Sequence, residues 1–71
     1  MIKFHATIHF IYLSKIDNII EEFKVLGVTE INNNRAIKYG IITGMIDKHM
    51  FPVLKDIYYI KGVEEDKGKS I

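Results

Sequence analysis

At 71 residues, with 48% hydrophobic residues and a single proline, the chain has the size and composition of one small folded domain, which argues against disorder. It contains no cysteine, so disulfides are excluded, and with only three scattered histidines we expect no metal and no cofactor. The net charge of +1 forms no basic stripe, and no apolar run has the length of a membrane span, so we expect a cytoplasmic protein with no nucleic-acid partner and no membrane partner.

Hydrophobic and polar residues alternate from residue 2 to residue 12, a pattern typical of a strand with one buried face. The side chains expected on the buried face are Ile2, Phe4, Ala6, Ile8 and Phe10. The side chains expected on the opposite face are Lys3, His5, Thr7 and His9.

A helix is predicted to begin at Ser14, because Ser14 and Asp17 have the spacing of a capping box. Gly27 fits the left-handed position that follows the end of a helix, and Val28 can pack back on the last turn. The apolar stripe of this helix consists of Ile16, Ile19, Ile20, Phe23 and Leu26.

A short strand is predicted over residues 28–31, followed by a turn at Asn32-Asn33-Asn34. The next strand is expected from Ala36 to Ile46, with Tyr39 and Ile41 as its core residues. Gly40 and Gly44 weaken it, which indicates a bulge or close packing against a helix at these positions.

Asp47 is the expected N-cap of a second helix, and Pro52 is expected in its first turn. A last strand is predicted from Ile60 to Asp66, so that the domain covers residues 1–66 and residues 67–71 form a mobile tail. The apolar stripe of the second helix consists of Met50, Val53, Leu54 and Ile57.

The expected order is therefore β-α-β-β-α-β. Two helices are enough to cover one face of a four-stranded antiparallel sheet, and right-handed crossovers favour the α+β ferredoxin-like arrangement.

Certain segments carry a resemblance to a known family: Leu26-Gly27-Val28, Tyr39-Gly40-Ile41-Ile42-Thr43-Gly44, Leu54-x-x-Ile57 and Ile60-x-x-Val63-Glu64-Glu65-Asp66. With the order of elements, they resemble the inhibitor I9 family, the propeptides and free-standing inhibitors of subtilisin-like serine proteases, and in particular its small bacterial stand-alone members. The resemblance implies docking on a protease through the sheet and the C-terminal segment. The chain departs from the family at Tyr58-Tyr59, where members often have Pro-Gly. No protease domain follows, so we expect an inhibitor, a chaperone acting in trans or a reused fold, and not a propeptide acting in cis.

The acidic end of the last strand is the sharpest functional feature of the sequence. We expect it to present carboxylates to a partner, together with the exposed sheet face and the tail; the alternative is a solvated strand end that limits aggregation. The candidate partner-binding residues are His5, Thr7, His9, Glu64, Glu65, Asp66, Lys67 and Ile71.

Catalytic signatures are missing from the sequence, so we expect no enzyme. Ser14 is explained by helix capping, and His5 and His9 lie about 13 Å apart on a strand, too far to bind one metal directly. Base stacking by Tyr12, Tyr58 and Tyr59 is disfavoured because the basic residues are few. The alternatives to a protease-binding module are a homodimer and a regulatory domain that binds a small ligand.

Overall fold

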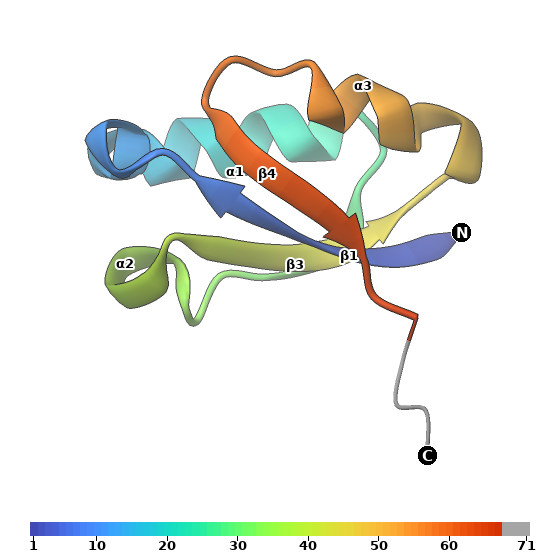
Figure 1. Cartoon of the computed structure of the whole chain (residues 1–71), viewed down its shortest axis with the longest axis horizontal. Coiled ribbons are helices and arrows are strands. Elements are labelled where there is room, and N and C mark those ends of the chain that lie inside the picture. Colours follow the sequence, from blue (N-terminus) through green and yellow to red (C-terminus); the bar gives the residue numbers. More distant parts are fainter. Residues whose placement is uncertain (68–71) are drawn as a thin grey trace.

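The computed structural model describes residues 1–67. Strand β1 (Ile2–Ile8) is an inner strand of its sheet. β1 pairs antiparallel with β3 (Ile41–Ile46) on one side and with β4 (Ile60–Glu65) on the other (Figure 1). β2 (Thr29–Asn32) pairs with the outer edge of β3, which gives the order β2-β3-β1-β4. Residues 1–67 therefore form an α+β structure with a four-stranded antiparallel sheet.

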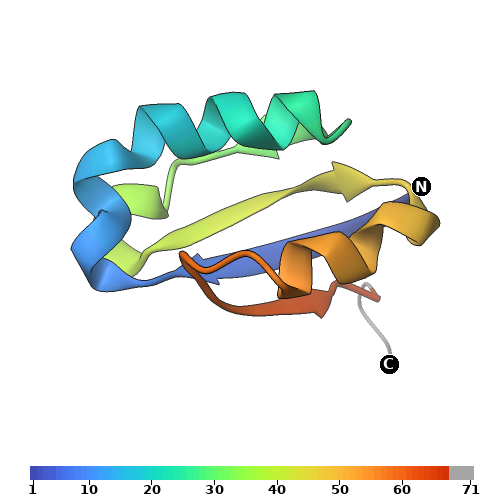
Figure 2. The ribbon, with the colours of Figure 1, turned by 90° about the horizontal axis from the view of Figure 1, so that it is seen from above.

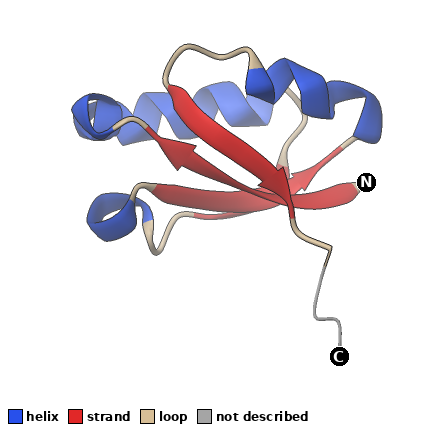
Figure 3. Ribbon diagram, in the orientation of Figure 1, coloured by secondary structure: helices blue, strands red, loops and turns tan. Residues whose placement is uncertain are grey.

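Helices α1 (Ile16–Val25) and α3 (Phe51–Lys55) cover one face of this sheet, as Figures 1 and 2 show from two directions. A 3₁₀ helix precedes each of them, η1 (Phe10–Lys15) and η2 (Lys48–Met50). A further helical turn, α2 (Ala36–Tyr39), joins β2 to β3 at the end of the sheet away from the N-terminus (Figure 3). The face opposite α1 and α3 is called the open face below.

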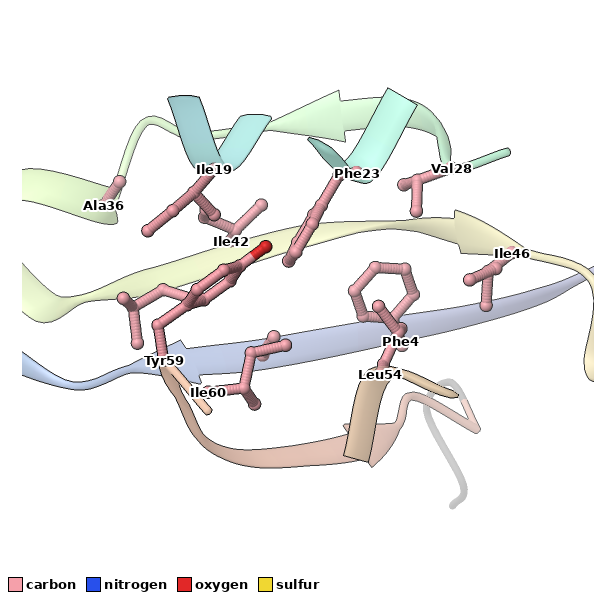
Figure 4. Packing of buried hydrophobic residues seen from close by; sticks show 12 residues of the cluster. Phe4, Ile19, Phe23, Val28, Ala36, Ile42, Ile46, Leu54, Tyr59 and Ile60 are labelled. Atoms are coloured by element: carbon pink, nitrogen blue, oxygen red, sulfur yellow. The ribbon is translucent and has the colours of Figure 1, made fainter. Parts of the chain in front are cut away.

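The core lies between the sheet and the two helices. β1 contributes alternate residues to it, as the period of two predicts, and the rings of Phe4 and Phe23 meet edge to face with 6.2 Å between their centroids. Leu54 of α3 and Tyr59 before β4 close the core on the β4 side (Figure 4). The buried residues are Phe4, Ala6, Ile8, Ile19, Phe23, Val28, Ala36, Ile42, Ile46, Leu54, Tyr59 and Ile60.

The end of α1 confirms the prediction made from Gly27. Gly27 has a φ of +92°, its N–H donates to Lys24 O at 3.0 Å, and the N–H of Val28 donates to Phe23 O at 3.0 Å. These two bonds form a Schellman motif, which satisfies carbonyl groups left unpaired at the helix end. Val28 is thereby directed into the core.

The start of the second helical segment also agrees with the sequence. The carboxylate of Asp47 accepts a hydrogen bond from the N–H of His49 at 2.7 Å and so caps η2. Pro52 lies in the first turn of α3, where its missing N–H has no helical partner to lose. Val53 departs from the predicted apolar stripe, because 39% of it is exposed.

The first predicted strand is too long. β1 ends at Ile8, and Phe10 is 84% exposed instead of buried. The chain turns at His9, whose N–H donates to Tyr59 O and whose carbonyl accepts from the N–H of Tyr12, both over 2.9 Å. These bonds begin η1, so β1 ends at Ile8. The alternation of apolar residues continues beyond Ile8 in the sequence, but the strand does not.

The predicted capping box at Ser14 is wrong as well. Ser14 lies inside η1, and α1 begins at Ile16 with Lys15 in the N-cap position and no side-chain cap. Asp17 does lie in the first turn of α1, where a carboxylate stabilises the positive end of the helix dipole.

The strand predicted from Ala36 to Ile46 is instead a helical turn followed by a shorter strand. Tyr39 belongs to α2 and is 59% exposed, so it is not a core residue. Gly40 ends α2 with a φ of +70°, and its carbonyl accepts a 2.7 Å hydrogen bond from the N–H of Ile8. Ile41, the other expected core residue, is half-buried at the start of β3.

Gly44 is packed closely, as expected, but against the β2 edge and not against a helix. A Cβ added there would lie 2.7 Å from Val28 Cγ1 and 3.1 Å from Thr29 O. β2 itself is one residue later than predicted, and its pairing with β3 is irregular around Glu30, which has a φ of +52°.

The last strand ends at Glu65, and the N–H of Asp66 still donates to Lys3 O at 2.7 Å. Of the tail predicted over residues 67–71, Lys67 is described and residues 68–71, including Ile71, lie outside the described residues.

Candidate binding face of the sheet

The alternation of β1 places His5 at the centre of the open face. Phe4, Ala6 and Ile8 point into the core, so the residues between them point the other way. His5 lies opposite Thr43 of β3 on one side and opposite Glu64 of β4 on the other. Three neighbouring strands therefore bring these side chains to one face.

His5 and Glu64 are in direct contact across β1 and β4. Nε2 of the imidazole lies 3.1 Å from Oε1 of the carboxylate, and the two side chains are 40% and 80% exposed. An exposed pair of this kind contributes about 0–1 kcal/mol to folding. Its main effect is to hold the carboxylate over the open face, beside the imidazole.

The three acidic residues at the end of β4 do not share one face. Glu65 is in register with Phe4, a core residue, so its side chain starts from the helix side of the sheet. Glu64 is on the open face, and Asp66 lines a hollow there. The acidic end is thus divided between the two faces.

A shallow groove lies on the open face between the end of β4 and the turn before α2. One hollow has a volume of about 380 Å³, and an adjoining hollow of about 390 Å³ shares Lys3, Asn32 and Thr43 with it. We call this pair of hollows the sheet groove. The residues that line the first hollow are Lys3, Asn32, Asn34, Arg35, Ile41, Thr43 and Asp66.

Local backbone bonds shape the wall of the sheet groove formed by the turn. Oδ1 of Asn32 accepts a hydrogen bond from the N–H of Asn34 at 2.9 Å, an Asx turn that reverses the chain after β2. The N–H of Ala36 donates to Asn33 O at 3.0 Å and begins α2. Arg35 follows this turn and directly precedes α2, and it lines the sheet groove.

Two cations line the sheet groove without an ion pair to any residue in the range 1–67. They are Lys3, which enters from β1, and Arg35, which enters from the turn. Asp66 supplies a carboxylate on the same lining. The groove therefore presents charges of both signs with hydroxyl and amide groups between them, a lining suited to polar side chains or main chain of a partner.

His9 does not lie beside His5 on a strand. It follows β1 and directly precedes η1, and its side chain is exposed. Thr7 is on the open face, in register with Ile41 and Gly62. Of the sequence-predicted site residues, the structure gathers His5, Thr7, Glu64 and Asp66 on or beside this face, while His9 and Glu65 are elsewhere.

His49 is bonded to the residue that caps its own helix. Its Nδ1 lies 3.1 Å from Oδ1 of Asp47, which also accepts the backbone N–H of His49. The backbone bond, followed by the side-chain bond, lowers the pKa of Asp47. Within residues 1–67, no three His, Asp or Glu side chains are grouped so that they could hold a metal ion.

Sequence reasoning missed most of the sheet groove. The face on which Lys3 and Thr43 lie could be predicted, because each alternates with buried neighbours along its strand. Asn32 and Asn34 lie in the turn that the sequence predicts, but Arg35 could not be placed, because it directly precedes α2, a single helical turn in a segment predicted as a strand.

No family model, curated protein or solved structure matches this chain. Among the helices formed by residues 1–67, none combines the length and the apolar character needed to cross a lipid bilayer.

Proposed function

We propose that this chain is a non-enzymatic protein-binding module that docks through the open face of its sheet, in the manner of the subtilisin propeptides and inhibitors that its sequence resembles. The observation that carries the proposal is that α1 and α3 cover one face only, and the other face carries the sheet groove beside the His5–Glu64 pair. A face of this kind offers a partner a broad surface with fixed polar groups.

The topology supports a ferredoxin-like domain as the frame of this module. β1 lies between β3 and β4, so α1 connects β1 to β2 across β3, and α3 connects β3 to β4 across β1. These are the two split β-α-β units of that arrangement. The helical turn α2 is an addition to it, and Asn34 and Arg35, which precede α2, line the sheet groove.

The carboxylates on the open face suggest how a partner is recognised. Glu64 and Asp66 lie on one side of the face, and carboxylates are favourable near the N-termini of helices, by about 0.3–1 kcal/mol each when exposed. A partner that presents helix N-termini or basic side chains fits this side. Lys3 and Arg35, in the groove beside them, fit acidic groups.

Titration into a subtilisin-class protease tests the proposal, with hydrolysis of a peptide substrate as the readout. We expect inhibition that depends on dose. A version truncated after Asp66 then separates the contributions: loss of inhibition assigns the binding to residues 67–71, and equal inhibition assigns it to the sheet face. Absence of inhibition, with slow digestion of the protein itself, would contradict the proposal.

Self-association is the second candidate, and the position of β4 favours it. β4 is at the edge of the sheet, and Figures 1 and 2 show no element beyond its outer side in residues 1–67. An edge strand offers main-chain groups to the same strand of a second copy. Sedimentation equilibrium over a range of concentrations decides between a monomer and a dimer.

A further inference from the structure

Large apolar side chains are exposed at the end of the molecule away from its N-terminus. We call this group the apolar tip, and its members are between 59% and 84% exposed. They come from η1, from α2 and from the loop before β4, and Figures 1 and 2 show η1 and α2 at this same end. The apolar tip consists of Phe10, Ile11, Ile37, Tyr39 and Tyr58.

A shared hollow and one ring contact connect these segments. Phe10 and Tyr39 line the same small hollow of about 180 Å³. The ring of Tyr58 lies 5.3 Å from the ring of Tyr12 in η1, which connects the loop before β4 to the same side. Single exposed apolar residues are common on protein surfaces and need no explanation. Five of them at one end of a molecule form a patch, and such patches mark interaction sites.

Positive charges surround the apolar tip. Lys38 and Lys61 line the hollow together with Phe10 and Tyr39, and Lys15 ends η1. The antiparallel pairing carries the C-terminal ends of β3 and β4 to the opposite end of the sheet, and with them Asp47 and the acidic residues of β4. Asp17, in the first turn of α1, is a carboxylate on the side of the tip. The acidic end of β4 and Asp47 therefore lie away from the apolar tip, at an end of the sheet that also carries Lys3 and Lys48.

We infer that the apolar tip docks on an anionic lipid bilayer. Its side chains project from short separate segments with lysines among them, and the interfacial region of a bilayer accommodates apolar side chains in any arrangement. Lysines beside them reach lipid phosphates while their stems stay in apolar surroundings. A symmetric pair of two such tips would bring the lysines of both copies together, which disfavours a second copy as the occupant.

This inference goes beyond the proposed function and uses a part of the surface that meets the open face only at Thr7. The sequence-based expectation of no membrane partner rested on the absence of a spanning segment, and a protein bound at the bilayer surface needs none. The open face remains accessible when the tip is docked, because the sheet groove lies between the β2–α2 turn and the end of β4, whereas the tip is built from η1, α2 and the loop before β4.

Vesicle flotation with the full chain tests the inference. We expect binding to phosphatidylcholine vesicles that contain phosphatidylserine, much weaker binding to pure phosphatidylcholine, and a decrease as salt is raised. F10S/I11S should lower the partition at least about tenfold. K38A/K61A should lower it roughly fivefold for each lysine.

V25S is the matched control, because Val25 is 86% exposed at the other end of α1, and it should bind as the parent chain does. All substituted side chains are exposed, and circular dichroism checks that the variants fold. The inference is overturned if anionic vesicles do not bind the chain, or if F10S/I11S binds as well as V25S. It is also overturned if ultracentrifugation shows a dimer that F10S/I11S abolishes, because the tip would then bind a second copy.

Discussion

The hydroxyl group of Tyr59 donates a hydrogen bond to Oε1 of Glu22 over 2.7 Å. The bond joins the loop before β4 to α1, two segments that are 37 residues apart in the chain. Tyr59 is a buried residue, and its N-terminal neighbour Tyr58 is exposed, so the pair divides into a core residue and a surface residue. No sequence pattern indicated this division.

Replacement of Tyr59 by phenylalanine should lower the free energy of unfolding by about 1–2 kcal/mol, because it removes a hydrogen bond to a charged acceptor and keeps the ring in the core. Urea denaturation followed by circular dichroism measures the change. Tyr58→Phe is the matched control, since that ring is exposed, and its effect should stay within about 0.5 kcal/mol. Equal losses for the two variants would contradict the role given to the Tyr59 hydroxyl.

The same residue predicts how stability responds to alkaline pH. Burial, followed by the hydrogen bond to Glu22, raises the pKa of Tyr59 above its ordinary value. The folded state then keeps its proton when the unfolded state, with a pKa of about 10, releases it, so stability is retained below pH 10 and falls as the pH rises above it. Urea midpoints between pH 8 and about 11 should fall less steeply for Tyr59→Phe than for the parent chain. Parallel curves would show that Tyr59 is not the responsible group.

Two glycines of the sheet should respond in opposite ways to the same substitution. Gly44→Ala places a Cβ 2.7 Å from Val28 Cγ1 and 3.1 Å from a backbone oxygen, so we expect a loss of about 1–3 kcal/mol. Gly62→Ala meets no atom within 4 Å and has no positive φ, so we expect little change or a small gain. Thermal denaturation of the two variants measures the difference. A loss at Gly62 as large as that at Gly44 would mean that packing against Val28 is not the cause.

The parts of the fold that were predictable are those specified by neighbouring residues. The Schellman motif at Gly27 and the cap at Asp47 each depend on a few adjacent positions, and both were found. The buried face of β1 was found as far as Ile8 for the same reason. Local patterns determine local structure, and here they also located the four strands along the chain, with some of their ends shifted.

The errors fall where a distant contact overrides the local pattern. Phe10 has the right parity for a buried strand position, but the bond from His9 to the Tyr59 carbonyl turns the chain away before it. Residues Ala36–Tyr39 are too few to show a helical period, so the sequence pattern predicts a strand where the structure has a single helical turn. Arg35, which directly precedes this helical turn, lines the sheet groove, and for that reason the groove could not be predicted as a unit.

The open face is the proposed docking surface, and one inhibition measurement tests this assignment. Thr43 lies at the centre of that face, in register with His5 and with Asn32, and it lines both hollows of the sheet groove. In the assay with a subtilisin-class protease, Thr43→Arg should weaken inhibition at least about tenfold, since the longer charged side chain fills the groove. Val25→Arg, on α1, should inhibit as the parent chain does. Undiminished inhibition by Thr43→Arg, or an equal loss with Val25→Arg, would contradict the open face as the binding surface.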